Sequence, residues 1–545
     1  MRKAIYTFVD RPKRYGQFLV FILSIVTACS SSNEDATAGY DVLIVNGLVY
    51  DGSRSPARRT NIGISDGRIA SIDAEPDSMA KRVIDASGQV VMPGFIDPHT
   101  HALNDLLSDE NNVNANYLMQ GVTTVFVGSD GGGIPELDAT LERMTAQGIG
   151  TNAAFFAGHG DIRERVMGLA NRAPTIQELE RMLALLEEQM KAGAVGLSTG
   201  LYYTPGSFST TDEVIALAKV AAGFGGVYDT HMRDESSYSV GLLASVEEVI
   251  RIAEGADIPV HISHLKALGK DVWGQSGDII AMVDEANERG LKVSANQYPY
   301  RASGTRFSAT LIPDWVRADS TARMFERLEN ADLKDRIRAE MKENLRRRGG
   351  AEAMLVTGAE SQWRGMTLAE IAADLDDDEL DAAIKVVRAG DPSIASFVMN
   401  IPDIEAIAIQ EWVMTGSDGS AGHPRKYATY PKAYQDMVVA GALFPIEQFV
   451  YRSSGLVADT FGLCNRGYLE PGRQADIVIL DLERYLPVAD FQKPTELATG
   501  VVHALVNGVP VVADGLLTGA LPGDVIDRQN IECGGRKQSR SRLLL

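Results

Sequence analysis

The sequence predicts an α/β protein built around a (β/α)8 barrel, with a small β-sandwich domain formed by both ends of the chain. Three observations lead to this prediction. Short apolar segments of strand length alternate with amphipathic helical segments through the middle of the 545 residues. The two ends of the chain are β-like instead, and most of the histidines directly follow the central apolar segments. A doubly wound open sheet is the alternative arrangement of the same elements.

Composition limits the classes of partner and of site. The chain has 52 basic and 73 acidic residues, which give a net charge of −21. Nucleic acids and anionic lipid surfaces attract basic patches, so we expect no nucleic-acid partner. Three cysteines are too few for a disulfide scaffold or a thiolate zinc site. Cys464 and Cys533 could pair in an oxidising periplasm, but we expect them to be unpaired thiols.

Residues 1–29 have the pattern of a lipoprotein signal peptide. Basic residues precede an apolar run from Phe18 to Ala28, which is too short for a membrane-spanning helix. The sequence VTAC that ends at Cys29 resembles the bacterial lipobox, in which the cysteine is lipidated and becomes the new N-terminus. We expect a lipid anchor at Cys29, a polar tether over residues 30–40 and a location at the periplasmic face of a bacterial membrane. Ser30 resembles an outer-membrane sorting signal, whereas a plain signal peptide with a chance cysteine is the alternative.

Residues 41–92 and 466–525 predict the β domain, and residues 526–545 a tail. Asn-Gly and Asp-Gly pairs between alternating apolar residues are strong hairpin signals. Such pairs occur at Asn46-Gly47, Asp66-Gly67 and Asn507-Gly508. We therefore expect a tight hairpin at each of these positions.

Residues 93–465 predict the barrel. A capping box formed by Thr175 and Glu178 begins a helix that is closed by Gly193. Further helices are predicted at about 211–222, 246–253 and 279–289, and each leads to a short strand. The eight predicted strand segments are GFIDPHTH, TTVFVGSDG, TNAAFFAGHGD, AVGLSTG, VYDTHMRDE, IPVHISHLK, LKVSANQYPY and WVMTGSDG.

The alternation of strand and helix stops between the seventh and eighth strands. Residues at about 302–411 are charged and mostly helical in pattern, and include ADLDDDELDAA. A gap of this length between strands is best explained by an insertion. We expect the insertion to cover the mouth of the barrel, although a surface subdomain without that role is the alternative.

Polar residues end the predicted strands, where barrels of this kind carry their active sites. Imidazoles together with carboxylates suit zinc, and a pair of ions needs an anionic bridge. A carboxylate beside the metal could serve as general base and acid, and Asp418 after the eighth strand has that position. The sequence therefore predicts a site for one or two Zn²⁺ ions among the strand-end residues, which are His99, His101, Asp130, His159, His231, His261, His264 and Asp418.

Seven motifs occur along the chain in a specific order: PGFIDPHTH, QGVTTVFVGSDGG, GHGDIRERVMG, GAVGLSTGLYYTPG, THMRDE, HISHLK and GSDG…HPR. This order resembles the N-acyl-D-amino-acid deacylases (D-aminoacylases) of the amidohydrolase superfamily, from about Asp41 to Gly523. The resemblance implies a metal-dependent hydrolase barrel. It also implies hydrolysis of the acyl amide bond of N-acyl-D-amino acids, or of D-amino-acid-containing dipeptides, by a metal-activated hydroxide.

The resemblance further implies roles for individual residues. One metal is bound by His99 and His101 beside the catalytic Asp418, and the other by His231 and His264. The substrate's carboxylate is held by Lys266, Tyr298 and Arg425. Tyr203 or its neighbour Tyr202 lines the side-chain pocket.

Two departures from the family pattern bear on the metal site. Asp130 stands where the family usually has a cysteine, and we expect its carboxylate to bridge the two ions. Ser198 stands where related cyclic amidases have a carboxylated lysine. This serine counts against the alternative function, a cyclic-amide hydrolase of dihydroorotase or hydantoinase type. A lipoprotein that only binds ligands is the third possibility, and the filled metal and base positions count against it.

The other histidines are expected to lie outside the metal site. His159 is expected to tie down a loop with Arg163. His261 is three residues from His264, so the two side chains leave a strand on opposite faces. His423 is expected to orient Arg425, and His503 to have a structural role in the β domain.

Overall fold

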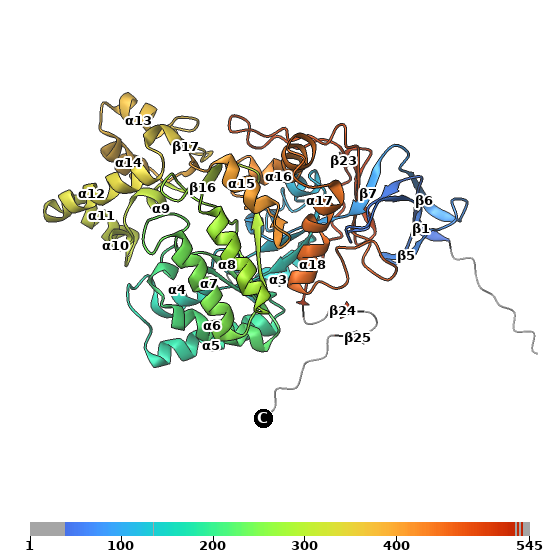
Figure 1. Ribbon diagram of the computed structural model, residues 1–545, viewed down its shortest axis with the longest axis horizontal. Helices are drawn as coiled ribbons and strands as arrows, with labels where there is room; N and C mark the ends of the chain where they lie inside the picture. The colour runs from blue at the N-terminus through green and yellow to red at the C-terminus, as the bar shows by residue number, and fades with distance from the viewer. Residues whose placement is uncertain (1–38, 135, 529–530, 534–535, 538–545) are drawn as a thin grey trace, which may run out of the picture. The chain divides into compact units, whose positions relative to one another are not determined.

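Eight parallel strands close into a barrel in the computed structural model (Figure 1). The structure describes residues 39–537 except 135, 529–530 and 534–535. The predicted signal peptide and Cys29 lie outside the described residues, as does the tether up to residue 38. Among the helices that are described, none has both the length and the apolar character needed to cross a membrane.

Each barrel strand pairs in parallel with the next. β10 and β11 act as one strand interrupted at Phe156, whose N–H donates to Val127 O of the preceding strand. The barrel closes where Thr100 bridges to Gly419 in parallel. The strands are β8 (Phe95–Asp97), β9 (Val122–Val127), β10 (Asn152–Phe155), β11 (Ala157–Gly158), β12 (Gly196–Gly200), β13 (Val227–His231), β14 (Val260–Ile262), β15 (Val293–Gln297) and β19 (Val413–Thr415). All eight predicted strands occur, so the predicted barrel is confirmed and the open sheet is excluded.

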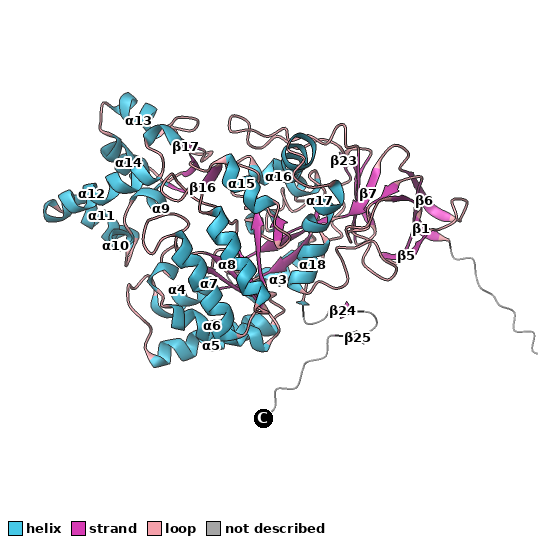
Figure 2. Ribbon diagram, viewed as in Figure 1, coloured by secondary structure: helices cyan, strands magenta, loops and turns pink. Residues whose placement is uncertain are grey.

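Helices lie outside these strands (Figure 2). The predicted capping box begins α5: Thr175 Oγ1 accepts from Glu178 N at 3.2 Å, and a Glu178 carboxylate oxygen accepts from Thr175 N at 2.7 Å. Its apolar face, which includes Met182 and Leu186, is buried in the main core. The helices are α1 (Leu103–Leu106), α2 (Ala115–Leu118), α3 (Leu137–Gln147), α4 (His159–Met167), α5 (Ile176–Lys191), α6 (Thr211–Gly223), α7 (Leu242–Ala256), α8 (Ser276–Glu288), α15 (Ile401–Ala408), α16 (Arg425–Ala433), α17 (Ile446–Ser453) and α18 (Gly455–Phe461).

Two further sheets contain the strands at the two ends of the described chain. One has the order β5-β4-β1-β6 and the other β23-β22-β21-β20-β7-β2-β3, in which β7 pairs with β20. A shared apolar cluster contains Ile44 and Ile64 from the first sheet and Ile479 from the second. The strands are β1 (Tyr40–Val45), β2 (Leu48–Val49), β3 (Arg58–Arg59), β4 (Ile62–Ser65), β5 (Arg68–Ile72), β6 (Ala80–Asp85), β7 (Val90–Pro93), β20 (Ile477–Leu480), β21 (Val501–Val506), β22 (Val509–Ala513) and β23 (Leu516–Leu517).

Two of the three predicted hairpins occur. Asp66-Gly67 joins the antiparallel pair β4 and β5, and Asn507-Gly508 joins β21 and β22. The hairpin predicted at Asn46-Gly47 is wrong. Both edges of β1 are already paired, with β4 and β6, so β2 pairs instead with β3 and β7 in the other sheet. Asn46, with φ of 64°, turns the chain from one sheet into the other.

The chain between β15 and β19 forms a unit with its own core. The antiparallel sheet β16-β18-β17 packs with helices, and buried members of its apolar cluster include Met341, Trp363 and Val386. The elements are β16 (Ala302–Arg306), α9 (Phe307–Leu311), α10 (Asp314–Arg317), α11 (Thr321–Glu329), α12 (Ala331–Arg347), β17 (Met354–Val356), α13 (Leu368–Leu375), α14 (Glu379–Arg388) and β18 (Ser393–Phe397).

Cys464, after α18, is disulfide-bonded. The expectation of an unpaired thiol there is therefore wrong. Composition shows how many cysteines a chain has but not which loops the fold brings together. The side chain of Cys533 lies outside the described residues.

Candidate metal centre

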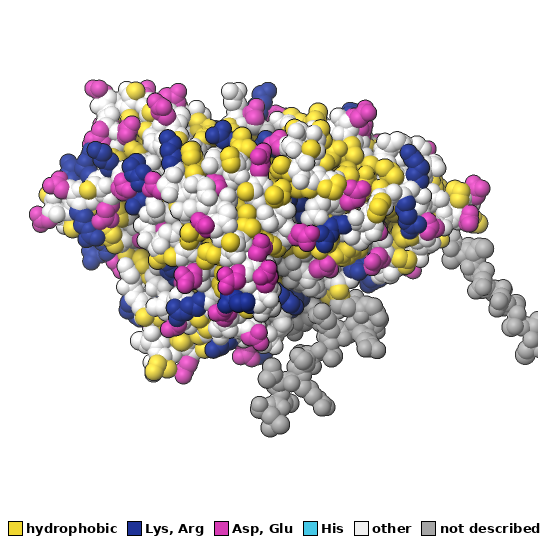
Figure 3. Space-filling view, in the orientation of Figure 1, with side chains coloured by type: hydrophobic (Ala, Val, Ile, Leu, Met, Phe, Trp, Pro, Cys, Tyr) yellow, Lys and Arg dark blue, Asp and Glu magenta, His cyan; other side chains and the backbone are white. Residues whose placement is uncertain are grey.

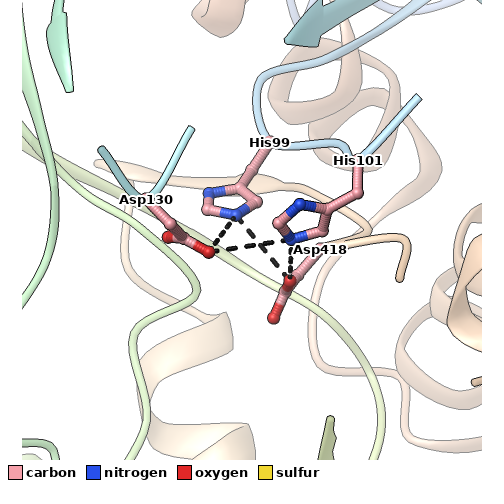
Figure 4. A group of neighbouring side chains, drawn as sticks. All are labelled: His99, His101, Asp130 and Asp418. Atoms are coloured by element: carbon pink, nitrogen blue, oxygen red, sulfur yellow. Dashed lines mark hydrogen bonds and ion pairs between the residues drawn. The ribbon is translucent and has the colours of Figure 1, made fainter. Parts of the chain in front are cut away.

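The barrel brings histidines and aspartates from distant parts of the chain to the carboxyl ends of its strands. His99 and His101 follow β8, and Asp130 follows β9. Asp418 follows β19, where its backbone N–H donates to His99 O at 2.9 Å. Figure 4 shows the side chains of these four residues pointing toward one another. His231 ends β13, and His264 lies two residues after β14.

These residues form two groups that share Asp130. One group is His99, His101, Asp130 and Asp418, and the other is Asp130, His231 and His264. Asp130 Oδ2 lies 3.5 Å from His99 Nε2 and 3.6 Å from His101 Nε2. Asp130 Oδ1 lies 3.4 Å from His264 Nε2 and 3.7 Å from His231 Nδ1. Each carboxylate oxygen of Asp130 therefore faces a different group.

The donor atoms suit a cation. Ligands about 2.0–2.2 Å from a tetrahedral zinc ion lie about 3.4 Å from one another, which is close to the separations around Asp130. Both ring nitrogens of the fully buried His99 and Oδ1 of Asp130 have no hydrogen-bond partner among the described residues. Buried polar atoms without partners are costly, and a metal ion would satisfy them. The residues present therefore fit a site for one or two ions.

The two aspartates of the centre are held in the charged form. Burial alone would raise the pKa of Asp130, but His99 and His264 outweigh this effect and keep the pKa well below its usual range. Burial would likewise raise the pKa of Asp418, and Arg425 with the nearby histidines lowers it instead. Burial lowers the pKa of His231 to about 4. Anionic carboxylates and neutral imidazoles are the forms that bind metal.

Three of these residues have left-handed backbone conformations. The φ angles are 56° for Asp130, 37° for His264 and 47° for Asp418. Such a conformation costs a non-glycine residue about 1–3 kcal/mol, and it persists where surrounding contacts impose it. The strain therefore lies at the residues that direct carboxylate and imidazole groups into the centre.

Glu235 and Lys266 lie behind His264. Glu235 Oε1 lies 3.0 Å from His264 Nδ1 and forms an ion pair with Lys266 Nζ. This contact leaves His264 Nε2 facing Asp130, as a partner behind a ligating imidazole does in metal sites. Glu235 was not among the predicted site residues, although its position four residues after His231, at the end of THMRDE, was a usable signal.

The residues predicted to hold a carboxylate are brought together. Arg425 lies 4.6 Å from the centre of the Tyr298 ring, and Lys266 Nζ lies 5.8 Å from the same ring. Both cations already have carboxylate partners, because Arg425 Nη1 is 2.7 Å from Asp418 Oδ2 and Lys266 pairs with Glu235. Within the part of the chain that the structure describes, the buried hydroxyl of Tyr298 has no hydrogen-bond partner.

A pocket opens beside the centre and is lined by His231, His264 and Asp418. Tyr202 and Tyr203, which follow β12, both line it. Residues of the insertion line it as well, including Ser303 and Thr305 on β16 and Arg348 after α12. Arg348 was not among the predicted site residues, because it lies far along the chain from the barrel strands.

The remaining histidines belong to neither group. His261 Nδ1 lies 2.9 Å from Ser294 Oγ, and its Nε2 lies 2.8 Å from Asn296 Nδ2. The other three have partners of their own: His159 lies 3.0 Å from Glu213 Oε1, His423 Nδ1 accepts from Arg425 N at 3.1 Å, and His503 Nδ1 accepts from Asp514 N at 3.4 Å.

Ser198 supports the loop that carries Asp130. Its hydroxyl donates to Gly128 O at 2.5 Å and accepts from Gly131 N at 3.1 Å. The side chain is therefore engaged on both sides of Asp130, and it presents no anionic group at β12.

Known proteins resemble the chain over most of its length. Residues 82–512 match the model of the amidohydrolase family. A D-aminoacylase of Alcaligenes xylosoxydans xylosoxydans is 33% identical over 518 residues, an alignment that covers 90% of this chain and 98% of the relative. A solved N-acyl-D-glutamate deacylase of Bordetella bronchiseptica, complexed with zinc and a phosphonate inhibitor, is 31% identical with a TM-score of 0.77 and covers 90% of this chain and 100% of its own. A solved D-aminoacylase with a binuclear metal centre is 31% identical with a TM-score of 0.76, and covers 89% of this chain and 99% of its own.

Proposed function

Because this chain belongs to the N-acyl-D-amino-acid deacylase (D-aminoacylase) family of the amidohydrolase superfamily, we propose that it hydrolyses the acyl amide bond of N-acyl-D-amino acids. The substrate is a small N-acyl amino acid or a dipeptide that contains a D-amino acid. The observation that carries the proposal is the position of Asp130, whose two oxygens face two separate groups of imidazoles.

The residues that would hold zinc are the two groups that share Asp130. His99, His101 and Asp418 lie on one side of it, and His231 and His264 on the other. When bound, a zinc ion supplies a Lewis acid that polarises the scissile carbonyl and acidifies water. Asp130 is the bridge between the sides, because among the described residues it alone belongs to both groups.

Asp418 moves the proton of the reaction. Its Oδ1 lies 3.2 Å from His101 Nε2, and Asp418 also lines the pocket. As a charged carboxylate it accepts the proton of the attacking water and then donates it to the departing amine nitrogen. Arg425 fixes the other oxygen of Asp418 and keeps the carboxylate charged until it takes that proton.

Lys266, Tyr298 and Arg425 hold the α-carboxylate of the substrate. A carboxylate there must share Arg425 with Asp418 and Lys266 with Glu235, and it gains the unpartnered hydroxyl of Tyr298. With that carboxylate and the scissile carbonyl both fixed, the two enantiomers differ in where the side chain goes, and Tyr203 lines that space. The preference for the D enantiomer is inferred from the similarity to the deacylases of N-acyl-D-amino acids.

A cyclic-amide hydrolase of dihydroorotase or hydantoinase type is the weaker candidate. Ser198 is committed to the Asp130 loop through Gly128 and Gly131, so no anionic bridge comes from β12. A linear amide substrate is therefore the better match to these residues.

The proposal extends to the location of the protein and to its accessory parts. Cys29 is lipidated and holds the protein at the periplasmic face of a bacterial membrane, as the VTAC sequence suggests. The disulfide at Cys464 suits an oxidising compartment. The sheets that share the cluster around Ile44 form a small sandwich domain, and the insertion acts as a cover over the pocket that its residues line.

A paired assay tests the proposed reaction. The purified protein is analysed for bound metal and incubated with N-acetyl-D- and N-acetyl-L-amino acids that carry the same side chains, and amine release is measured. We expect zinc in the protein and faster release across the D-series. Faster release from the L-series would contradict the assigned hand, and turnover of hydantoins or dihydroorotate alone would favour the cyclic-amide reaction.

A further inference from the structure

Arg348 is a buried cation that enters the active-site pocket from the insertion. It lies directly after α12, only 2% of its surface is exposed, and it lines the same pocket as Asp418 and His264. The barrel brings the metal centre to this pocket, and the insertion adds a positively charged side chain to the pocket's lining. The insertion thus contributes a charged side chain to the pocket as well as covering it.

The partners of Arg348 are all neutral hydroxyl groups. Nε donates to the Tyr238 hydroxyl at 2.5 Å, Nη1 to Ser303 Oγ at 3.1 Å, and Nη2 to the Tyr202 hydroxyl at 3.3 Å. The guanidinium group has more N–H donors than these three bonds use. One N–H on each Nη is left without a partner among the described residues. A guanidinium group presents its N–H donors in a planar fork that can bind both oxygens of a carboxylate.

Neighbouring cations differ from Arg348 because each has a carboxylate partner. On the face in Figure 3, basic and acidic side chains lie together over the insertion. Each arginine within α12 forms an ion pair: Arg336 with Glu340, Arg338 with Asp378, Arg346 with Asp271 and Arg347 with Glu343. At the metal centre, Lys266 pairs with Glu235 and Arg425 with Asp418. No carboxylate oxygen of the described residues lies within 4.0 Å of an Arg348 nitrogen.

A buried charge without a counter-charge is costly, and an anionic ligand removes that cost. The metal centre accounts for the scissile amide, and the group around Tyr298 accounts for the α-carboxylate. We propose that Arg348 binds a second carboxylate on the substrate and so makes the protein selective for N-acyl-D-amino acids that carry one. This proposal rests on the proposed function and adds a substrate class to it.

The second carboxylate can come from either end of the substrate. It can belong to an acidic side chain, as in N-acetyl-D-glutamate, or to a dicarboxylic acyl group, as in N-succinyl-D-leucine. Both present the same planar anion to the guanidinium group. Neutral counterparts of nearly equal shape, N-acetyl-D-glutamine and N-succinamoyl-D-leucine, isolate the effect of charge in each case.

The kinetic test compares kcat/KM for each acidic substrate and its neutral counterpart in four proteins. The wild type should prefer the acid of at least one pair by about 10²-fold, the scale of a buried, hydrogen-bonded charge pair. Arg348→Gln should lose that preference by slowing the acid and leaving the neutral substrate almost unchanged. Arg348→Lys keeps the charge without the fork and should retain part of the preference. Arg346→Gln, at an exposed arginine of α12 that pairs with Asp271 and Glu343, is the matched control and should keep all of it.

A binding measurement gives a result that does not depend on turnover. Calorimetry compares the products D-glutamate and D-glutamine, and succinate and succinamate, on the wild type and on Arg348→Gln. Tighter binding of an acid that disappears in the variant supports the proposal, and the pair that shows it identifies the source of the carboxylate. Equal binding and equal kcat/KM within both pairs would overturn it, including the case in which Arg348→Gln only lowers the melting temperature.

Failure of this proposal and failure of the proposed function give different results. Hydrolysis of neutral N-acetyl-D-amino acids without any preference for acids removes the role of Arg348 and leaves the reaction in place. Arg348-dependent binding of an acidic product without hydrolysis of any N-acyl-D-amino acid removes the reaction and leaves the anion site.

Discussion

Asp418 and Arg425 form a buried ion pair in which Arg425 Nη1 lies 2.7 Å from Asp418 Oδ2. The other oxygen of the same carboxylate, Oδ1, lies 3.2 Å from His101 Nε2. One side chain thus connects the metal centre with the cation predicted to hold the substrate's carboxylate. Proton transfer and substrate binding are coupled through Asp418.

Asp418→Asn should preserve the fold and most of the metal while kcat falls by about 10²-fold or more, the usual scale of general acid–base catalysis. The amide keeps the shape of the side chain but cannot accept the proton of water. The measurement is kcat on an N-acetyl-D-amino acid, with the metal content of the same sample. Asp436→Asn, at an exposed residue paired with Lys432, is the control and should be unaffected. A near-normal kcat in Asp418→Asn would remove Asp418 from the mechanism.

Asp130→Ala should lose metal and nearly all activity. The group with His231 and His264 would keep only two imidazoles, because Asp130 is its third member. Asp130→Cys restores the residue usual in the family and should retain metal and measurable activity. Metal content and amine release are measured on both variants. Normal zinc binding and turnover by Asp130→Ala would place the bridge elsewhere.

Lipidation at Cys29 predicts a change in fractionation. Cys29→Ser should give an unprocessed or soluble species, whereas the wild type should incorporate labelled fatty acid and sediment with membranes. Ser32→Ala, in the polar tether after the VTAC sequence, is the control and should fractionate like the wild type. Wild-type protein without a fatty-acid label, with the same fractionation as Cys29→Ser, would exclude the anchor.

His261 predicts a loss of stability in acid. Burial lowers its pKa from 6.5 to about 3 in the folded protein. Between these values the unfolded chain binds a proton that the folded protein does not, so the unfolding free energy is complete above pH 6.5 and falls as the pH drops toward 3. His261→Gln cannot bind that proton. The difference in unfolding free energy between metal-free wild type and His261→Gln, measured in urea at pH 7.5 and pH 5, should shift in favour of the variant at the lower pH. A difference that is the same at both pH values would show that His261 does not titrate as inferred.

The barrel strands were predictable because their signals are local. A segment such as VYDTH carries its own apolar run and its own terminal imidazole, and the helix that follows carries its own period. The turn at Asn46 was not predictable in the same way. Asn46-Gly47 has the composition of a hairpin, but pairing was decided by β6 and β7, which arrive later in the chain.

The residues of the site also differ in whether their signals in the sequence are local. The metal residues follow strands, so their order along the chain placed them at one end of the barrel. Glu235 had a local signal, its position four residues after His231, that went unused. Arg348 could not be found in this way, because its importance depends on neighbours that are distant in sequence. In the sequence, Arg348 resembles the other arginines of a charged helical segment. The fold shows that those arginines pair with carboxylates, whereas Arg348 donates to hydroxyl groups.

The pairing of β7 with β20 sets the order in which the molecule can be completed. Met92 of β7 lies opposite Val478 of β20, so β7 can form this pairing only after β20 has been synthesised. Until the C-terminal segment has been synthesised, β7 presents an open hydrogen-bonding edge of buried, apolar residues, which is a template for intermolecular pairing. The sheet can therefore be completed only in a chain that includes β20. A chain truncated before β20 would keep much of its barrel sequence but should aggregate, and a chaperone that shields β7 during synthesis would raise the yield of native protein.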